Sequence, residues 1–162
     1  MEQKIVAVSG VKNSGKTTLL ENIIPLLKDR GILAAVIKHD GHGFVPDVPG
    51  TDTYRCLESG ACGCAIFCAD RFMVVKEEPG MDEARLLEAF PEADLILLEG
   101  FKNSSYPKIE VVRKGNSDAC VCAPETLLAV VSDMEAAPEG VRRIGLNDYE
   151  EVAEMLYLLC RG

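Results

Sequence analysis

The feature that most constrains this chain is a glycine-rich segment at residues 10–17. It reads Gly-Val-Lys-Asn-Ser-Gly-Lys-Thr and matches G-x-x-x-x-G-K-[ST] at every fixed position. A β-branched apolar run at residues 4–9 precedes it, and leucine and isoleucine recur at helical spacing over residues 16–29. A buried strand that enters such a loop and a helix that leaves it form a phosphate-binding unit. The segment therefore predicts a nucleoside triphosphate site on an α/β fold.

Each residue type in this loop suits one part of the chemistry. Gly10 and Gly15 permit backbone angles and a close approach that a Cβ would block. We expect Lys16 to reach the β- and γ-phosphates, and Thr17 to ligate Mg²⁺ through its hydroxyl. Lys12 either contacts phosphate or a carboxylate, or is simply solvated. The predicted phosphate-binding set is Gly10, Asn13, Ser14, Gly15, Lys16, Thr17 and Thr18, with Thr18 at the α-phosphate.

Acidic and imidazole side chains follow other strand-like segments. The apolar run at residues 93–99 ends at Glu99 beside a glycine. Ligands bind at the carboxyl ends of strands in open α/β sheets, so we predict that Glu99 holds Mg²⁺ or a water; the alternative is a solvated acid. The segment His39-Asp40-Gly-His42 could bind a metal, orient a water or contact phosphate, although it lacks the paired ligands typical of zinc sites. The alternative is that these side chains are solvated or cap a helix.

Strand-like and helix-like segments alternate along the chain. This alternation predicts a three-layer P-loop NTPase fold, in which helices cover both faces of a mainly parallel sheet and a mixed sheet is allowed. We expect one nucleotide-binding domain over residues 1–162, because no long linker interrupts the pattern. Beyond the loop unit, we predict strands at 33–38, 63–69, 72–76, 93–99, 107–113 and 127–131, helices at 51–59, 81–90 and 148–160, and an irregular stretch at 40–50.

Charge and cysteine content narrow the class of protein. The net charge of −9 argues against binding to nucleic acid or anionic membranes, and no apolar run is long enough to span a bilayer. We expect a cytoplasmic protein, since no signal peptide is visible and the odd count of seven cysteines favours free thiols. Cys62, Cys64 and Cys68 would share one strand face, so we interpret them as buried packing residues rather than converging metal ligands.

With these residues identified, the chain resembles the molybdopterin-guanine dinucleotide biosynthesis protein MobB family over most of its length. The phosphate loop is shared with many NTPases. The occurrence of both the motif at residues 98–102 and the motif at residues 107–111 is much more specific to this family. The matching blocks are residues 10–19, 37–39 with His42 and Asp47, 49–52, 59–61, Leu98-Glu-Gly-Phe-Lys102, Pro107-Lys-Ile-Glu-Val111 and Ile144-Gly-Leu-Asn-Asp148.

The resemblance implies several properties of this chain. It implies GTP binding with Mg²⁺, slow GTP hydrolysis, a homodimer, and a supporting role beside the transferase that joins GMP to molybdopterin. Carried over to this sequence, Lys16 with Glu99 or Asp52 becomes the catalytic or water-positioning set. The chain departs from the family pattern at His39-Asp-Gly-His42, where adjacent histidines are common, and in its cysteine-rich segment at 62–68.

Base preference has one candidate reader. Asp133 follows the strand predicted at 127–131, and a carboxylate there could accept both N–H donors of guanine, which adenine would not match. The alternative is an ordinary turn aspartate.

The function that these features favour is a GTP-binding accessory protein for guanylation of the molybdenum cofactor, at most a slow Mg²⁺-dependent GTPase. Its expected partners are the molybdopterin guanylyltransferase, molybdopterin-containing proteins and a second copy of the chain. Two alternatives stay open, a P-loop kinase of a small molecule and an adaptor that binds nucleotide without hydrolysing it.

Overall fold

The structure is a computed structural model that describes residues 2–162. The chain divides into two compact units, Met1–His39 with Leu86–Gly162 and Asp40–Arg85. The expectation of one domain over residues 1–162 stays a prediction. In the part of the chain that the structure describes, no helix is both long and apolar enough to cross a bilayer.

The first unit contains a six-stranded sheet in the order β2-β5-β1-β6-β7-β8. Every neighbouring pair in this sheet runs parallel, including the strand near residue 108, which could have paired antiparallel. The predicted α/β class is thereby confirmed. The strands are β1 (Lys4–Ser9), β2 (Ala34–Lys38), β5 (Leu95–Glu99), β6 (Lys108–Val112), β7 (Leu127–Ser132) and β8 (Arg142–Gly145).

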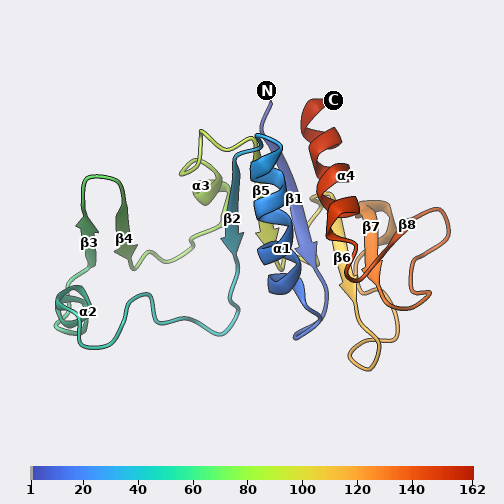
Figure 1. Ribbon diagram of the computed structural model, residues 1–162. Helices are drawn as coiled ribbons and strands as arrows, with labels where there is room; N and C mark the ends of the chain where they lie inside the picture. Colours follow the sequence, from blue (N-terminus) through green and yellow to red (C-terminus); the bar gives the residue numbers. More distant parts are fainter. Residues whose placement is uncertain (1) are drawn as a thin grey trace. The chain divides into compact units, whose positions relative to one another are not determined.

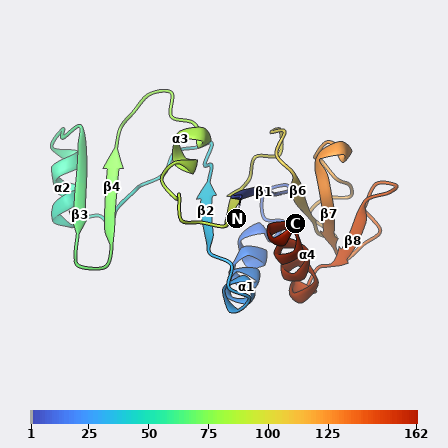
Figure 2. The same ribbon diagram turned by 90° about the horizontal axis from the view of Figure 1, so that it is seen from above.

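Apolar side chains cover both faces of this sheet. The helices α1 (Lys16–Asp29) and α4 (Tyr149–Arg161) lie side by side on one face, where they pack on alternate residues of the strands (Figure 1). Helix α3 (Glu83–Leu87) lies on the opposite face from α1 and α4 (Figure 2). Its Leu86 and Leu87 pack against the apolar cluster that contains Ile96 and Leu98 of β5. Because β5 is covered on both sides, all five of its residues are buried.

The strand register brings three strand ends together. Glu99 lies opposite Lys38 of β2 on one side and Val8 of β1 on the other. Since all three strands are parallel, the end of β5 reaches the same sheet edge from which the phosphate loop leaves β1. The register therefore sets Glu99 beside the loop.

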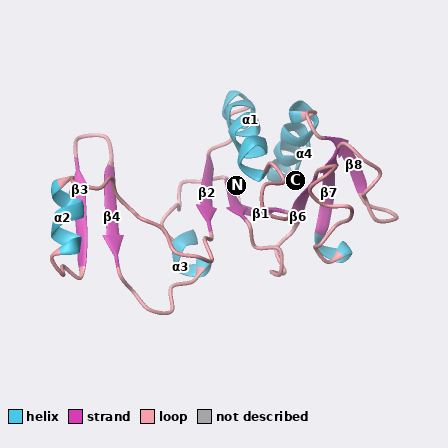
Figure 3. Cartoon of the chain, turned by 90° about the horizontal axis from the view of Figure 1, so that it is seen from below, coloured by secondary structure: helices cyan, strands magenta, loops and turns pink. Residues whose placement is uncertain are grey.

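The second unit contains one helix and a hairpin. Helix α2 (Asp52–Glu58) begins after Thr51, whose Oγ1 accepts a hydrogen bond from the Tyr54 N–H. Strands β3 (Gly63–Phe67) and β4 (Phe72–Lys76) pair antiparallel beside this helix (Figure 3). Residues 40–50 form neither helix nor strand, as predicted.

Three expectations from the sequence need correction. The helix predicted over 81–90 is confined to residues 83–87, because the Asp82 carboxylate accepts the Arg85 N–H and turns close the other end. Strand β8 was missed, since its arginine pair lacks an apolar pattern. The cysteines are free, but Cys62 and Cys68 are exposed rather than buried, because both lie outside β3 and one helix covers only part of this hairpin.

Candidate functional site

The phosphate loop requires backbone conformations that few residues adopt. Gly10 and Gly15 have φ angles of 137° and 104°, and Asn13 has a φ of 62°. A Cβ on Gly10 would lie 2.5 Å from the carbonyl oxygen of Val111 and 2.8 Å from Ser14 Oγ. Asparagine is among the few residues that tolerate the left-handed region. The loop sequence is thus matched to a chain that folds tightly over the end of β6.

Lys16 folds back over the loop that precedes it. Its Nζ donates hydrogen bonds to the carbonyl oxygens of Val11 (2.8 Å) and Gly10 (3.3 Å). Burial lowers the pKa of Lys16, Glu99 raises it, and the nearby Lys38 and Lys102 lower it further. An anion bound beside Nζ would favour the charged form of the lysine. The group is therefore placed to bind phosphate.

Thr17 and Glu99 form the second part of the site. The Thr17 hydroxyl donates to Glu99 Oε1 at 3.0 Å, and Lys38 Nζ lies 3.3 Å from the same oxygen. Only 7% of Glu99 is exposed, so the alternative of a solvated strand-end acid is wrong. A hydroxyl and a carboxylate are hard oxygen ligands of the kind Mg²⁺ takes, and the rest of its shell is usually water and phosphate. These two residues would hold the ion, whose charge would neutralise phosphate oxygens.

The segment after Glu99 is held in an unusual conformation. Gly100 and Phe101 both have positive φ angles, 107° and 50°. Ser9 Oγ donates to the Gly100 carbonyl, and the Phe101 ring lies 5.7 Å from the His39 ring. A non-glycine residue with positive φ persists only where its surroundings enforce it. These contacts keep the carboxylate of Glu99 in a defined place.

Two buried charged residues of β6 hold loops on either side of it. Lys108 Nζ donates to the carbonyl oxygens of Ser104 and of Tyr106 (2.8 Å), and burial lowers its pKa. The Glu110 carboxylate accepts the N–H groups of Val121 (2.6 Å) and Cys122 (3.0 Å). The block Pro107-Lys-Ile-Glu-Val111 therefore has a structural role, because its two buried charged side chains are hydrogen bonded to the backbone of neighbouring loops.

The loop that Glu110 anchors also contacts the phosphate loop. Asn116 Nδ2 donates to the Lys12 carbonyl at 3.0 Å, and the Lys114 N–H donates to Asp133 Oδ1 at 2.8 Å. Asp133 thus holds a turn in place, which is the alternative that the sequence left open. Its reading of guanine stays a prediction.

The other predicted residues lie in the unit Asp40–Arg85. Asp52 is the first residue of α2, is exposed, and lies 3.9 Å from Arg55. Asp40 Oδ1 accepts the His42 N–H at 3.0 Å, so this pair forms a local turn. A catalytic role for Asp52 stays a prediction.

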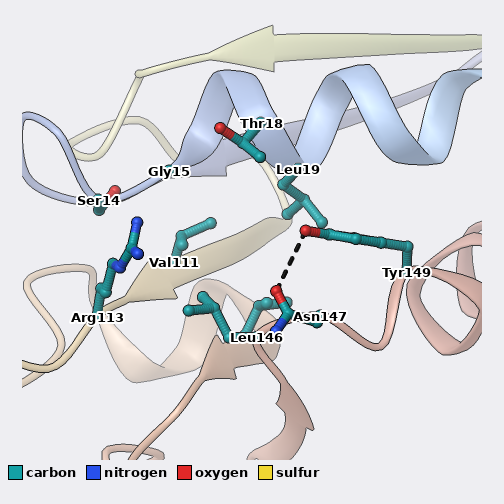
Figure 4. A pocket seen from close by; sticks show the side chains of 10 residues that line it. Ser14, Gly15, Thr18, Leu19, Val111, Arg113, Leu146, Asn147 and Tyr149 are labelled. Carbon is teal, nitrogen blue, oxygen red and sulfur yellow. Dashed lines mark hydrogen bonds between the residues drawn. The ribbon is translucent and has the colours of Figure 1, made fainter.

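A pocket borders the phosphate loop and contains residues that sequence reasoning missed. Ser14, Gly15 and Thr18 line one side of it, and Arg113, Asn147 and Tyr149 line the other (Figure 4). Within residues 2–162, Ser14 Oγ is the one buried side-chain oxygen or nitrogen without a hydrogen-bond partner. In the sequence, the residues opposite the loop were marked only by the family block at residues 144–148, and that block gave no indication of a pocket.

Comparison with known proteins finds relatives over most of the chain. The family model described as molybdopterin guanine dinucleotide synthesis protein B, MobB, matches residues 5–133. The molybdopterin-guanine dinucleotide biosynthesis adapter protein of Escherichia coli (strain K12) is 32% identical over 163 residues, which cover 94% of this chain and 90% of the relative.

Solved structures show the same fold. The crystal structure of Bacillus subtilis MobB is 29% identical with a TM-score of 0.75, and the match covers 94% of this chain and 97% of that one. A crystal structure of molybdopterin-guanine biosynthesis protein B is 26% identical with a TM-score of 0.74, and the match covers 98% of this chain and 99% of that one. The chain therefore belongs to the molybdopterin guanine dinucleotide synthesis protein B (MobB) family.

Proposed function

We propose that this protein binds GTP with Mg²⁺ and acts as an accessory protein in guanylation of the molybdenum cofactor. The observation that carries nucleotide binding is the cluster of Lys16, Thr17 and Glu99 beside the glycine-rich loop. Family membership supports the pathway, because the Escherichia coli relative is named an adapter of molybdopterin-guanine dinucleotide biosynthesis. The expected partners are the guanylyltransferase and molybdopterin-containing proteins, and we place the protein in the cytoplasm.

Hydrolysis by this site should be slow. Lys16 and the metal would neutralise charge on the phosphates, and Glu99 or Asp52 would position the attacking water. Residues 10–17 contain no arginine that could stabilise the transferred phosphoryl group from within the loop. In other NTPases an arginine finger, supplied from another segment of the chain or by a partner protein, adds about 10³–10⁵ in rate, so a loop without an arginine of its own is compatible with weak GTPase activity.

Calorimetry with GTP tests nucleotide binding directly. We expect Mg²⁺-dependent binding that Lys16→Ala abolishes, because the substitution removes the charge that meets the β- and γ-phosphates. Lys28→Ala, an exposed lysine of the same helix, is the matched control and should bind like the wild type. Wild-type protein that fails to bind GTP, or a Lys16→Ala variant that binds it equally well, would contradict the proposal.

A homodimer is the assembly that we propose. One face of the β3–β4 hairpin carries Phe67, Phe72 and Val74, which are 83%, 79% and 61% exposed. A two-stranded hairpin is marginally stable alone, and a monomer seldom leaves such an apolar face in water. A second copy of the chain would cover it.

A further inference from the structure

The pocket beside the phosphate loop lies on one side of β1, and Glu99, the candidate metal ligand, lies on the other. In the sheet order, β5 with Glu99 adjoins β1 on one side, whereas β6, β7 and β8 follow on the other. The carboxyl ends of those three strands form the pocket, through Arg113, Val131 and Leu146. Glu99 and the pocket therefore face the phosphate loop from opposite directions.

This arrangement gives a bound nucleotide a direction. In P-loop NTPases the Mg²⁺ site lies beside the β- and γ-phosphates. If Thr17 and Glu99 hold the ion, the γ-phosphate end of the nucleotide would lie beside them. A nucleotide is a linear chain of phosphates, sugar and base, and its nucleoside must then leave the loop on the other side. The wall residues Ser14, Gly15 and Thr18 start the pocket at that point.

The pocket has the size and lining of a base site. Its volume is about 130 Å³, below the roughly 300–1,000 Å³ of pockets that enclose whole drug-sized ligands. Leu19, Val131 and Leu146 supply apolar surface for the face of a planar ring. At the loop end, the buried Ser14 Oγ has no hydrogen-bond partner in the described chain, and a buried hydroxyl without one is costly unless a ligand completes it.

The polar side chains stand at opposite ends of the pocket. The Arg113 guanidinium points toward Ser14 and the phosphate loop, whereas Asn147 and Tyr149 lie at the far end (Figure 4). The Tyr149 hydroxyl donates to Asn147 Oδ1 at 3.3 Å. This contact orients the carboxamide and leaves Nδ2, with its two N–H groups, as the donor available to a ligand.

The donors match one purine better than the other. The edge of guanine carries the acceptors N7 and O6, whereas adenine carries a donor, its 6-amino group, beside N7. We propose that this pocket is the nucleobase subsite, that Asn147 Nδ2 donates to O6 of guanine as a specificity-determining contact, and that Arg113 binds the sugar-phosphate end of the same nucleotide. This inference rests on the proposed binding of GTP. Tyr149 is a positioning residue, because it acts through Asn147.

Inosine triphosphate separates this reading from the one through Asp133. It keeps the O6 acceptor of guanine but lacks the 2-amino group that a carboxylate reader would use. A contact through Asn147 predicts that GTP and inosine triphosphate bind with similar Kd values and that ATP binds more weakly. A contact through Asp133 predicts that inosine triphosphate loses affinity.

Calorimetry of GTP, inosine triphosphate and ATP with Mg²⁺ tests the proposal. We expect Asn147→Ala to weaken GTP and inosine triphosphate about three- to tenfold and to leave ATP unchanged, in line with loss of one hydrogen bond. Asn147→Asp, which has nearly the same shape, should reverse the preference toward ATP. Arg113→Ala should weaken all three nucleotides by the same factor, and Tyr149→Phe should reduce only the preference for the 6-oxo purines.

Asn103→Ala, at an exposed asparagine outside the pocket, is the matched control, and thermal unfolding checks the fold of each variant. If GTP binding requires Lys16 but is unchanged by both Asn147 substitutions, the proposed base subsite is wrong while the proposed GTP binding stands. If the wild type binds inosine triphosphate more weakly than GTP, and Asp133→Asn binds the two equally, Asp133 recognises the base instead. Wild-type protein that binds no nucleotide would overturn the proposed function together with this inference.

Discussion

At the scale of single residues, the site depends on a contact between Thr17 and Glu99, whose oxygens lie 3.0 Å apart. We expect Glu99→Gln to weaken GTP binding in the presence of Mg²⁺ while it leaves metal-free binding unchanged, because the amide keeps the hydrogen bond but loses the charge that attracts the cation. Calorimetry at several Mg²⁺ concentrations measures this. Glu92→Gln, an exposed acid of the same unit, serves as the control. Equal Mg²⁺ dependence in the wild type and Glu99→Gln would remove Glu99 from the metal site.

Thiol acidity is a second property decided residue by residue. Burial and the Glu110 carboxylate raise the pKa of Cys122 to about 12, from an ordinary value of 9.0. Because the folded pKa is the higher one, this thiol's contribution to stability is complete below about pH 9 and is lost as pH rises toward 12. We expect Cys122→Ala to lose less stability than the wild type between about pH 8 and pH 10.5 in urea unfolding. If both proteins lose the same free energy of unfolding over this pH range, the pKa of Cys122 is not raised in the folded state.

At the scale of elements, the anchored loop 113–122 is the device that ties β6 to the phosphate loop. Glu110→Ala would leave the Val121 and Cys122 N–H groups without their acceptor, and the loss costs about 1–3 kcal/mol at the buried Cys122 N–H and less at the part-buried Val121 N–H. Chemical denaturation should show this loss. Glu125→Ala, at an exposed acid, should change stability by less than about 0.5 kcal/mol. A Glu110→Ala protein as stable as the wild type would show that water replaces the carboxylate.

At the scale of the whole molecule, the β3–β4 hairpin has an apolar face that one chain leaves exposed. We expect the wild type to sediment as a dimer and Phe67→Ser with Phe72→Ser to sediment as a monomer, because the substitutions remove the apolar area that would be buried. Leu158→Ser, at a residue of α4 that is 59% exposed, is the control and should remain dimeric. A monomeric wild type, or a dimeric double variant, would exclude this interface.

Local signals in the sequence were sufficient for the phosphate loop and for the elements around it. Gly10 and Gly15 mark the turn, helical spacing places α1 at residues 16–29, and Thr51 marks the start of α2, because each signal depends on neighbours a few residues away. The parallel α/β class also followed from the alternation of such segments. The sequence did not predict β8, because polar residues make up half of that strand, and it placed the ends of α3 too far apart.

Only the tertiary structure decided which distant groups meet. Thr17 and Glu99 are 82 positions apart and come together because β1 and β5 pair in parallel register. The burial of Glu110 against the backbone of residues 121–122, and the placement of Arg113 and Asn147 around one pocket, depend in the same way on strand order. Strand pairing is a non-local choice, so the sequence by itself determined a phosphate-binding loop, and the order of the sheet determined what surrounds it.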